Sequence, residues 1–126
     1  MSQVLKHADI TEKIIGCAFE VHKFLGNGFP EVIYQRALAI EFHLAGLKFE
    51  GEVEQPIYYR NSAEKIGTRR ADFIVEDKVL VELKATALLD DVHVAQLLNY
   101  LKVYRFEVGL VLNFGGRSMN FRRLAL

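Results

Sequence analysis

The side chains that could do chemistry together are Asp72, Glu82 and Lys84, three charged residues that interrupt two apolar runs of the sequence. Two carboxylates close to an amine could hold a divalent cation, because hard cations prefer carboxylate oxygens as ligands. A half-buried pair of carboxylates is costly unless a cation lies between the groups or one group is protonated. These residue types therefore predict a metal site, provided that the fold brings them together.

The stretch that carries these residues predicts a β-hairpin, because two alternating apolar runs are joined by the charged residues 76–78. A three-residue loop pairs Val75 with Val79. Counting outward, Asp72 then faces Glu82, with Cβ atoms roughly 4.5–5.5 Å apart. A two-residue loop would instead put the two acids on opposite faces of the sheet, so the site depends on an odd loop length.

A plainer interpretation of the same residues is a solvated edge hairpin in which Lys84 neutralises Glu82. The neighbouring residues argue against it, because Val79, Val81 and Leu83 alternate with the charges and would face a core. A nearly continuous apolar run is typical of an interior strand, where a charge needs a specific reason.

Two helices are expected before the hairpin. Asp9 and Glu12 are spaced as a capping box that would start the first helix, which should end at residues 26–28. Pro30 would open a second helix that ends at Gly46. Their inner faces are expected to carry Ile10, Ile14, Cys17, Ala18, Val21, Phe24 and Leu25 in the first helix, and Ile33, Ala37, Leu38, Ile40 and Leu44 in the second.

The remaining elements complete a mixed sheet. Residues 47–60 alternate as a strand, or as two strands broken at Pro56. Asp90 or Asp91 would cap a third helix that runs to about residue 104, apolar almost all round and therefore expected to be well covered. Residues 108–112 predict a buried strand parallel to a central one, and residues 119–124 predict a last edge strand. The fold class is α/β, a mixed central sheet flanked by helices.

Two further pairs of polar residues share helix faces. Gln96 and Tyr100 are four apart on the third helix, and Glu31 and Tyr34 are three apart on the second. Each has an ordinary interpretation, since a first-turn acid is favoured by the helix dipole and a tyrosine can belong to the core. The polar ends of Gln96 and Tyr100 could also lie above the strand ends that carry the charged residues.

Composition indicates one soluble globular domain over residues 1–126, expected to be cytoplasmic. The single cysteine, Cys17, allows no internal disulfide, and no apolar run approaches the roughly 18–20 residues of a membrane span. The formal net charge is zero, so any anion-binding surface must be local. Residues 67–126 carry nine Lys and Arg against seven Asp and Glu, with Arg69 and Arg70 among them.

Together these motifs resemble a known family. Asp72 followed by Glu82-Leu83-Lys84 is similar to the signature of the PD-(D/E)XK nuclease superfamily, and residues 96–100 resemble the QxxxY motif of its exonuclease-type branch. Residues 28–34, Gly-Phe-Pro-Glu-Val-Ile-Tyr, match the motif of the GxxExxY protein family within that superfamily. The order and spacing of the three motifs are specific in combination, although the ExK triplet alone is a weak signal.

The resemblance implies a restriction-endonuclease-like core of the αβββαβ type with an extra N-terminal helix. It implies Mg²⁺, with Mn²⁺ as a substitute, held by Asp72, Glu82 and the main-chain carbonyl of Leu83, with Glu31 bound directly or through water. Lys84 would orient or deprotonate the attacking water, or stabilise the charge on the phosphate.

Further roles follow from the same resemblance. Gln96 would position the lysine or the water, and Tyr100 a phosphate or the substrate strand. Nucleic-acid contacts are expected from Arg69, Arg70 and Tyr34, of which the two arginines lie outside the family motif.

Three functions are compatible with these residues. The first is a Mg²⁺-dependent nuclease that acts on DNA, or alternatively on RNA. The second is a non-catalytic module on the same fold that binds nucleic acid or a protein; zero net charge and a short chain favour it, because affinity for nucleic acid needs several phosphate contacts. A homodimer or a partner protein could supply those contacts. The third is a hydrolase of small phosphate compounds. The complete set of polar motif residues favours the nuclease.

Overall fold

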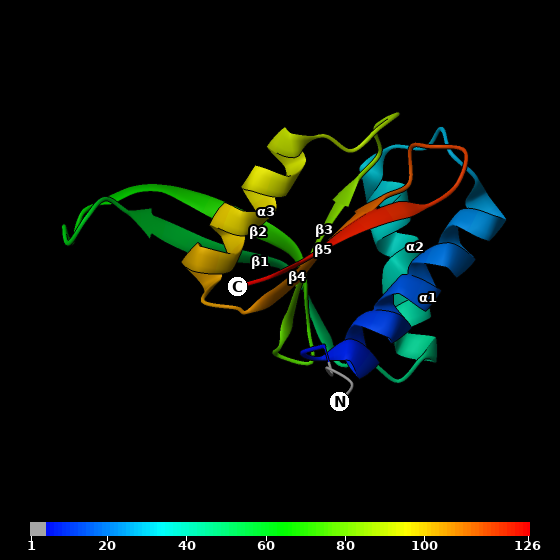
Figure 1. The fold of residues 1–126 in the computed structure, drawn as a ribbon, viewed down its shortest axis with the longest axis horizontal. Helices are drawn as coiled ribbons and strands as arrows, with labels where there is room; N and C mark the ends of the chain where they lie inside the picture. The colour runs from blue at the N-terminus through cyan, green and yellow to red at the C-terminus, as the bar shows by residue number, and fades with distance from the viewer. Residues whose placement is uncertain (1–4) are drawn as a thin grey trace.

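The computed structural model describes residues 5–126, which form a mixed sheet with helices on both faces (Figure 1). The strand order is β1-β2-β3-β4-β5; β3 and β4 are parallel, and the other neighbours are antiparallel. The predicted αβββαβ order, preceded by an extra helix, is confirmed. In chain order the elements are α1 (Ala8–Leu25), α2 (Glu31–Leu44), β1 (Phe49–Tyr58), β2 (Lys65–Val75), β3 (Val79–Lys84), α3 (Asp91–Tyr104), β4 (Val108–Asn113) and β5 (Asn120–Ala125).

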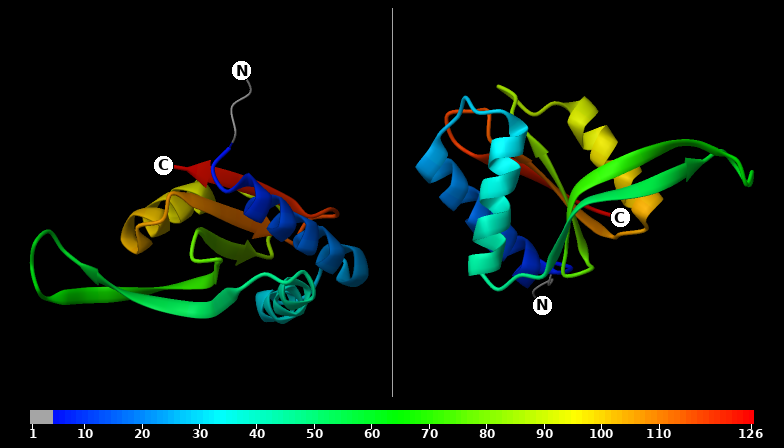
Figure 2. Two further views of the ribbon diagram at one scale, coloured as in Figure 1. Left: turned by 90° about the horizontal axis from the view of Figure 1, so that it is seen from below. Right: turned by 180° about the vertical axis from the view of Figure 1, so that it is seen from behind.

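Two cores lie on opposite faces of the sheet. Helices α1 and α2 cover one face, where Val79, Val81 and Leu83 of β3 are buried as predicted. Helix α3 covers the other face through Leu97 and Leu101, and Figure 2 shows the two helical layers on either side of the sheet. The residues of β3 that point toward α3 therefore lie in the second core or at its edge.

The turn between β2 and β3 has the predicted three residues. Val75 pairs with Val79, and residues 76–78 form the loop. Glu76 and Asp77 both have positive φ, 54° and 55°, the left-handed region in which aspartate is more frequent than most residues. The register on which the carboxylate pair depends is thus confirmed.

Strands β1 and β2 extend well beyond the sheet. Residue 73 is the last residue of β2 paired with β3, and from Val53 and Ala71 outward β1 and β2 pair only with each other. We call residues 53–70 the arm; it projects away from the body in Figures 1 and 2. Of the two alternatives for residues 47–60, the single strand is confirmed and the break at Pro56 is wrong, because Pro56 pairs in line with Thr68. A proline is tolerated here because β1 is an edge strand.

The two N-terminal helices begin and pack differently from the prediction. Helix α1 starts at Ala8 after His7, and no side chain caps it, so the predicted capping box is wrong. Its end at Leu25, followed by Gly26 with φ 67°, agrees with the prediction. Phe24, Ile40 and Leu44 are 80%, 62% and 74% exposed rather than buried. Both helices carry apolar residues on two faces, so periodicity alone did not identify which face is buried.

Helix α3 is less covered than its composition suggests. Asp90 caps it by accepting hydrogen bonds from the main-chain N–H groups of residues 92 and 93, as expected for an N-cap aspartate. Leu97, Leu101 and Tyr104 are buried, whereas Val92 is 61% exposed, so the expectation of a well-covered helix is wrong.

Candidate functional site

Asp72 and Glu82 lie where β2 and β3 stop pairing. The last paired residues are Phe73 and Val81, so Asp72 and Glu82 occupy the next positions outward, on neighbouring strands. Oδ2 of Asp72 accepts a hydrogen bond of 2.7 Å from the main-chain N–H of Leu83. This bond replaces the strand-to-strand hydrogen bond that Leu83 would otherwise make, and it fixes the Asp72 carboxylate beside Glu82.

The two carboxyl groups cannot both ionise easily. Burial raises the pKa of Glu82 to about 9, with repulsion from Asp72 as the second cause. Burial also raises the pKa of Asp72, although the hydrogen bond from Leu83 opposes the shift. Near neutral pH Glu82 therefore keeps its proton while it lies beside Asp72. One carboxylate and one carboxylic acid in contact are the arrangement expected when a cation is missing from between two acids.

A divalent cation fits this pair. Oε1 of Glu82 is buried and has no hydrogen-bond partner within residues 5–126, so one carboxyl oxygen of the pair is available to a cation. Carboxylate oxygens are the ligands that Mg²⁺ and Ca²⁺ prefer. Within residues 5–126, no three His, Cys, Asp or Glu side chains lie close enough together to hold an ion on their own. An ion here would accordingly need main-chain oxygen or water besides the two acids.

A small hollow continues the site toward α3. It is lined by Glu82 and Lys84 from β3, by Val111 from β4, and by His93, Gln96, Leu97 and Tyr100 from α3. Its free volume is about 10 Å³, roughly enough for one water molecule. The structure thus brings Lys84, Gln96 and Tyr100 together with the acids. Burial raises the pKa of Tyr100, and the negative charge of Glu82 adds to this effect.

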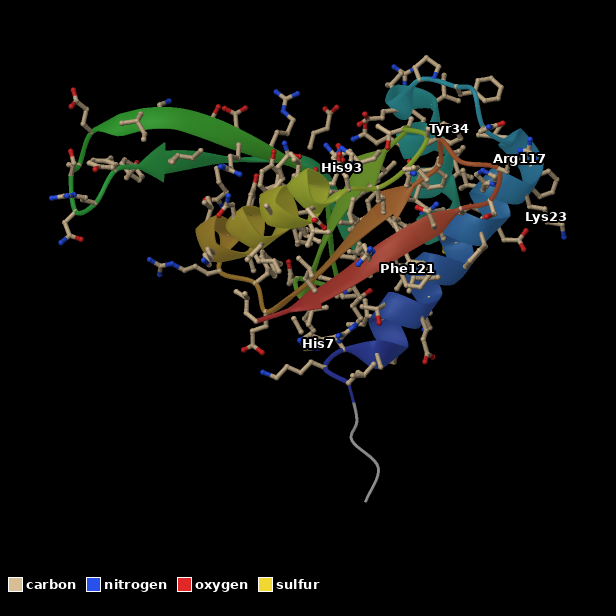
Figure 3. The ribbon with its side chains drawn as sticks, turned by 45° about the horizontal axis from the view of Figure 1, so that its top comes forward. His7, Lys23, Tyr34, His93, Arg117 and Phe121 are labelled. Carbon is tan, nitrogen blue, oxygen red and sulfur yellow. The ribbon has the colours of Figure 1, made fainter. Side chains whose placement is uncertain are left out.

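His93 is a site residue that the sequence analysis missed. It lines the same hollow, and its Nδ1 atom accepts a hydrogen bond of 3.3 Å from the main-chain N–H of Asp90. Figure 3 places it at the start of α3, facing the space between α3 and α2. Its spacing from Gln96 and Tyr100, three and seven residues, puts it on their helix face and was a signal available in the sequence.

Glu31 approaches the site from the other helical layer. Partial burial raises the pKa of its carboxyl group; the positive charge of Lys84 lowers it, and the charge of Asp72 raises it. The residue as a whole is exposed, at the first position of α2. Glu31 is therefore within electrostatic reach of the acids but is not part of a three-acid cluster.

The loop before α2 depends on the other motif residues. Gly28 has φ 104°, a conformation that glycine adopts without strain. Tyr34 is fully buried and stacks on Phe114. Its hydroxyl donates to the carbonyl of Gly26 at 2.6 Å and accepts from the N–H of Phe29 at 3.3 Å. Buried in this way, Tyr34 holds the loop that carries Glu31 and offers no surface to nucleic acid, unlike the role expected from the sequence.

The two arginines differ in their environments. The guanidinium of Arg69 lies 4.8 Å from the ring centroid of Tyr100, which connects the arm to the site hollow. Arg70 is exposed and forms a 3.5 Å ion pair with Glu54 on the neighbouring strand. The structure therefore brings Arg69 next to the site, whereas Arg70 pairs across the arm with Glu54.

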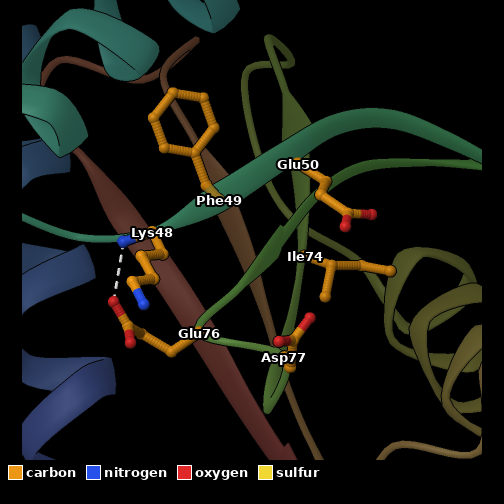
Figure 4. Close-up of a pocket in the computed structure, with 6 residues that line it drawn as sticks. All are labelled: Lys48, Phe49, Glu50, Ile74, Glu76 and Asp77. Carbon is orange, nitrogen blue, oxygen red and sulfur yellow. Dashed lines mark hydrogen bonds between the residues drawn. The ribbon is translucent and has the colours of Figure 1, made fainter.

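A different hollow lies at the far end of β2, beside the turn to β3 (Figure 4). Its free volume is about 190 Å³, and it is lined by Lys48, Phe49, Glu50, Ile74, Glu76 and Asp77. The carboxylate of Glu76 accepts a hydrogen bond of 2.6 Å from the main-chain N–H of Lys48. Of its three acids, Glu76 and Asp77 are turn residues and Glu50 lies in β1. No motif residue lines the hollow, so we assign it no chemistry.

Comparisons with known proteins agree with this geometry. Residues 8–124 match the family model described as the PD-(D/E)XK nuclease superfamily. Among solved structures, the chain is similar to the crystal structure of SSO0001, with a TM-score of 0.50 and 19% identity over 92% of this chain and 77% of that one. At this identity the likeness supports the fold alone. A search of curated proteins found no match. No helix in residues 5–126 is long and apolar enough to cross a membrane.

Proposed function

The chain belongs to the PD-(D/E)XK nuclease superfamily, and from this premise we propose that it is a metal-dependent nuclease that hydrolyses phosphodiester bonds in DNA. The observation that carries the proposal is the pair of acids on neighbouring strands, in which Leu83 fixes Asp72 and the buried Oε1 of Glu82 has no hydrogen-bond partner within residues 5–126. Within the superfamily we assign the chain to the GxxExxY protein family, from residues 28–34, and treat residues 1–126 as one nuclease domain.

Mg²⁺, or Mn²⁺ in its place, is the cofactor that these ligands suit. Asp72, Glu82 and the main-chain carbonyl of Leu83 would hold it, and Glu31 would contribute through a bridging water. When bound, such an ion polarises the phosphate and lowers the pKa of a coordinated water. The chain's own contribution is to fix Asp72 through Leu83 and to give up the proton of Glu82 when the ion binds.

The other site residues surround the place where the phosphate would lie. Lys84 is two residues after Glu82 on the same face of β3, so its ammonium can donate to the negative charge that develops on the phosphate, or orient the attacking water. Gln96, one turn before Tyr100 on α3, can hold the lysine or that water by hydrogen bonds. Tyr100, with the Arg69 guanidinium on its ring, is placed to contact the phosphate of the substrate strand.

A cleavage assay on end-labelled DNA tests the function. Wild type should cleave in Mg²⁺ or Mn²⁺ and not in EDTA, and Lys84→Ala should lower the rate by about a hundredfold or more, as expected for loss of a charged group that contacts the transition state. Lys78→Ala is the matched control, because Lys78 is an exposed lysine in the turn of the same hairpin. Equal activity in Lys84→Ala and Lys78→Ala would contradict the proposed role of the site.

The second candidate is a binding module without catalysis. Its support is the zero net charge of the chain, which gives no general attraction for nucleic acid. DNA binding that persists in EDTA, with no Lys84-dependent cleavage in either metal, would favour this candidate.

A further inference from the structure

The arm, residues 53–70, is a two-stranded ribbon beside the site. Its strands pair with each other from Val53–Ala71 out to Tyr58–Lys65 and with no third strand. A two-stranded ribbon fits the width of the DNA major groove, whereas a wider sheet does not. Figures 1 and 3 show the arm projecting past α3 on the side away from α1.

The base of the arm is fixed to the helix that carries Gln96 and Tyr100. The hydroxyl of Tyr104 accepts a hydrogen bond of 2.9 Å from the N–H of Ala71. It lies 2.5 Å from the carbonyl oxygen of Val53 and 2.9 Å from that of Arg69, either of which can accept its proton. Both strands of the arm are thereby tied to the end of α3. The direction of the arm relative to the site is therefore set by the fold.

The charge of the arm differs from that of the whole chain. Residues 53–70 contain four Lys and Arg against two Asp and Glu, whereas the full sequence is neutral. One of the two acids, Glu54, is paired with Arg70. The free end carries the exposed cations Arg60 and Lys65 and the other acid, Glu64, and therefore has a net charge of +1. Tyr58 and Tyr59 beside them are 51% and 60% exposed. Exposed cations next to aromatic rings are suited to the backbone and bases of nucleic acid.

We propose that the arm binds duplex DNA that flanks the cleaved phosphodiester, with Arg60 and Lys65 contacting phosphates. The proposal rests on the proposed nuclease function for the position of the cleaved bond. At about 3.3 Å per residue along β2, Lys65 lies roughly 23 Å from Asp72. At about 3.4 Å per base pair, the contacted phosphates are about seven base pairs from the cleaved one.

Fluorescence anisotropy with a labelled DNA duplex of about 24 base pairs, without divalent cation, measures the contribution of the arm. The test variant is Arg60→Ala with Lys65→Ala. The matched control is Lys13→Ala with Lys23→Ala, two exposed lysines of α1, of which Lys23 lies at the opposite end of the molecule from the arm (Figure 3). Both double variants lose the same charge, so long-range attraction falls equally in the two. Thermal melting of each variant verifies that the fold is retained.

The arm variant should bind about tenfold more weakly at 50 mM salt, and the control within about twofold of wild type. The slope of log K against log salt concentration should fall by about 1.8 in the arm variant only, at roughly 0.9 per lost phosphate contact. Equal losses in both variants would overturn the proposal, because net charge alone would explain them. Light scattering that shows a dimer in wild type and a monomer in the arm variant, with unchanged DNA affinity, would assign the arm to self-association and overturn it too.

Experiments with short and long duplexes distinguish DNA binding by the arm from the proposed nuclease function. A duplex of about eight base pairs centred on the site cannot reach Lys65, so the arm variant and wild type should bind it equally; a loss as large as with the long duplex would contradict the placement of the contact. If wild type binds DNA through the arm but cleaves it in neither metal, the proposed nuclease function is wrong and DNA binding by the arm still stands. If wild type cleaves DNA but the arm variant binds it as tightly as the control does, the nuclease function stands and DNA binding by the arm is wrong.

Discussion

The Asp72 carboxylate accepts a hydrogen bond of 2.7 Å from the main-chain N–H of Leu83, and it is this contact that holds Asp72 beside Glu82. A side-chain oxygen takes the place of a strand carbonyl at the point where β2 and β3 separate. The separation creates room for the site, and the hydrogen bond keeps the backbone donor of Leu83 satisfied. The two acids are thus positioned by the sheet itself rather than by a flexible loop.

The substitution Glu82→Gln should stabilise the metal-free protein near neutral pH. The pKa of Glu82 is near 9 in the folded chain, against 4.5 for an ordinary glutamate. The folded state therefore binds one more proton than the unfolded state between these values, so stability falls as pH rises from about 4.5 to 9. At pH 7 the loss is at most about 3.5 kcal/mol, at about 1.4 kcal/mol per pH unit. Glu82→Gln should flatten this slope in EDTA, measured by denaturant unfolding at several pH values; a slope equal to that of wild type would contradict the buried pair.

Binding of Mg²⁺ or Mn²⁺ should release a proton. An ion that uses Glu82 as a ligand needs its carboxylate form, which is the minor form below pH 9. Calorimetry in buffers of different ionisation enthalpy should report release of close to one proton at pH 7, with affinity rising as pH approaches 9. Glu76→Gln is a control, because Glu76 is an acid of the same hairpin outside the site. Equal heats of metal binding in wild type and Glu82→Gln would show that Glu82 is not a metal ligand and would exclude the proposed metal site.

Two glycine substitutions should have opposite effects on stability. A Cβ atom on Gly115 would lie 2.2 Å from the carbonyl oxygen of Thr86, which is backbone and cannot move away cheaply. Thr86 and Gly115 both donate to the Asn113 side chain, so Gly115→Ala should separate the loops that follow β3 and β4. We expect a loss of about 3 kcal/mol or more, in the range of severe core changes.

Gly16→Ala is the control for that substitution. Gly16 lies within α1 and has no atom within 4 Å of an added Cβ, so alanine should stabilise the helix by about 0.5–1 kcal/mol. Denaturant unfolding measures both values. Similar losses in the two variants would show that the close approach at Gly115 is not the cause.

Tyr34→Phe should loosen the loop that carries Glu31. Its hydroxyl donates to Gly26 at 2.6 Å in a fully buried position, so removal leaves a main-chain carbonyl without its partner. A cost of about 1–3 kcal/mol is usual for such a loss. Tyr58→Phe, at an exposed tyrosine of the arm, should change stability by less than about 0.5 kcal/mol. Amide exchange should quicken at residues 26–29 in Tyr34→Phe only; protection unchanged there would contradict the structural role.

The sequence predicted the parts of the site that depend on counting along one hairpin. Strand alternation and a three-residue loop were enough to place Asp72 opposite Glu82, because both positions are set by one local turn. The exposure of Ile40 and Leu44 was not predictable, since α2 has apolar residues on two faces and packing against α1 and β3 selects the face that carries Tyr34, Leu38 and Phe42. Tertiary packing determines which apolar face of a helix is buried, and helical periodicity alone does not predict it.

Tyr34 illustrates the same limit within the site. Its motif position suggested a contact with substrate, but its hydroxyl is satisfied by the main chain of the preceding loop, a partner that no spacing rule identifies.

The backbone of β1 at Glu52 was also not predicted from the sequence. Glu52 has φ 53° opposite Asp72, and its negative charge raises the pKa of Asp72.

His93 should contribute to cleavage beyond its part in starting α3. The ring lines the site hollow, and it also accepts from the main chain of Asp90, so His93→Ala removes both a helix-start contact and a hollow-lining group. Asp90→Ala removes only the cap and leaves the ring in place. Each variant should lose about 1 kcal/mol of stability. Only His93→Ala should lower kcat/KM by tenfold or more, equivalent to about 1.4 kcal/mol of transition-state stabilisation. Equal kcat/KM in the two variants would show that His93 only stabilises the start of α3 and does not contribute to cleavage.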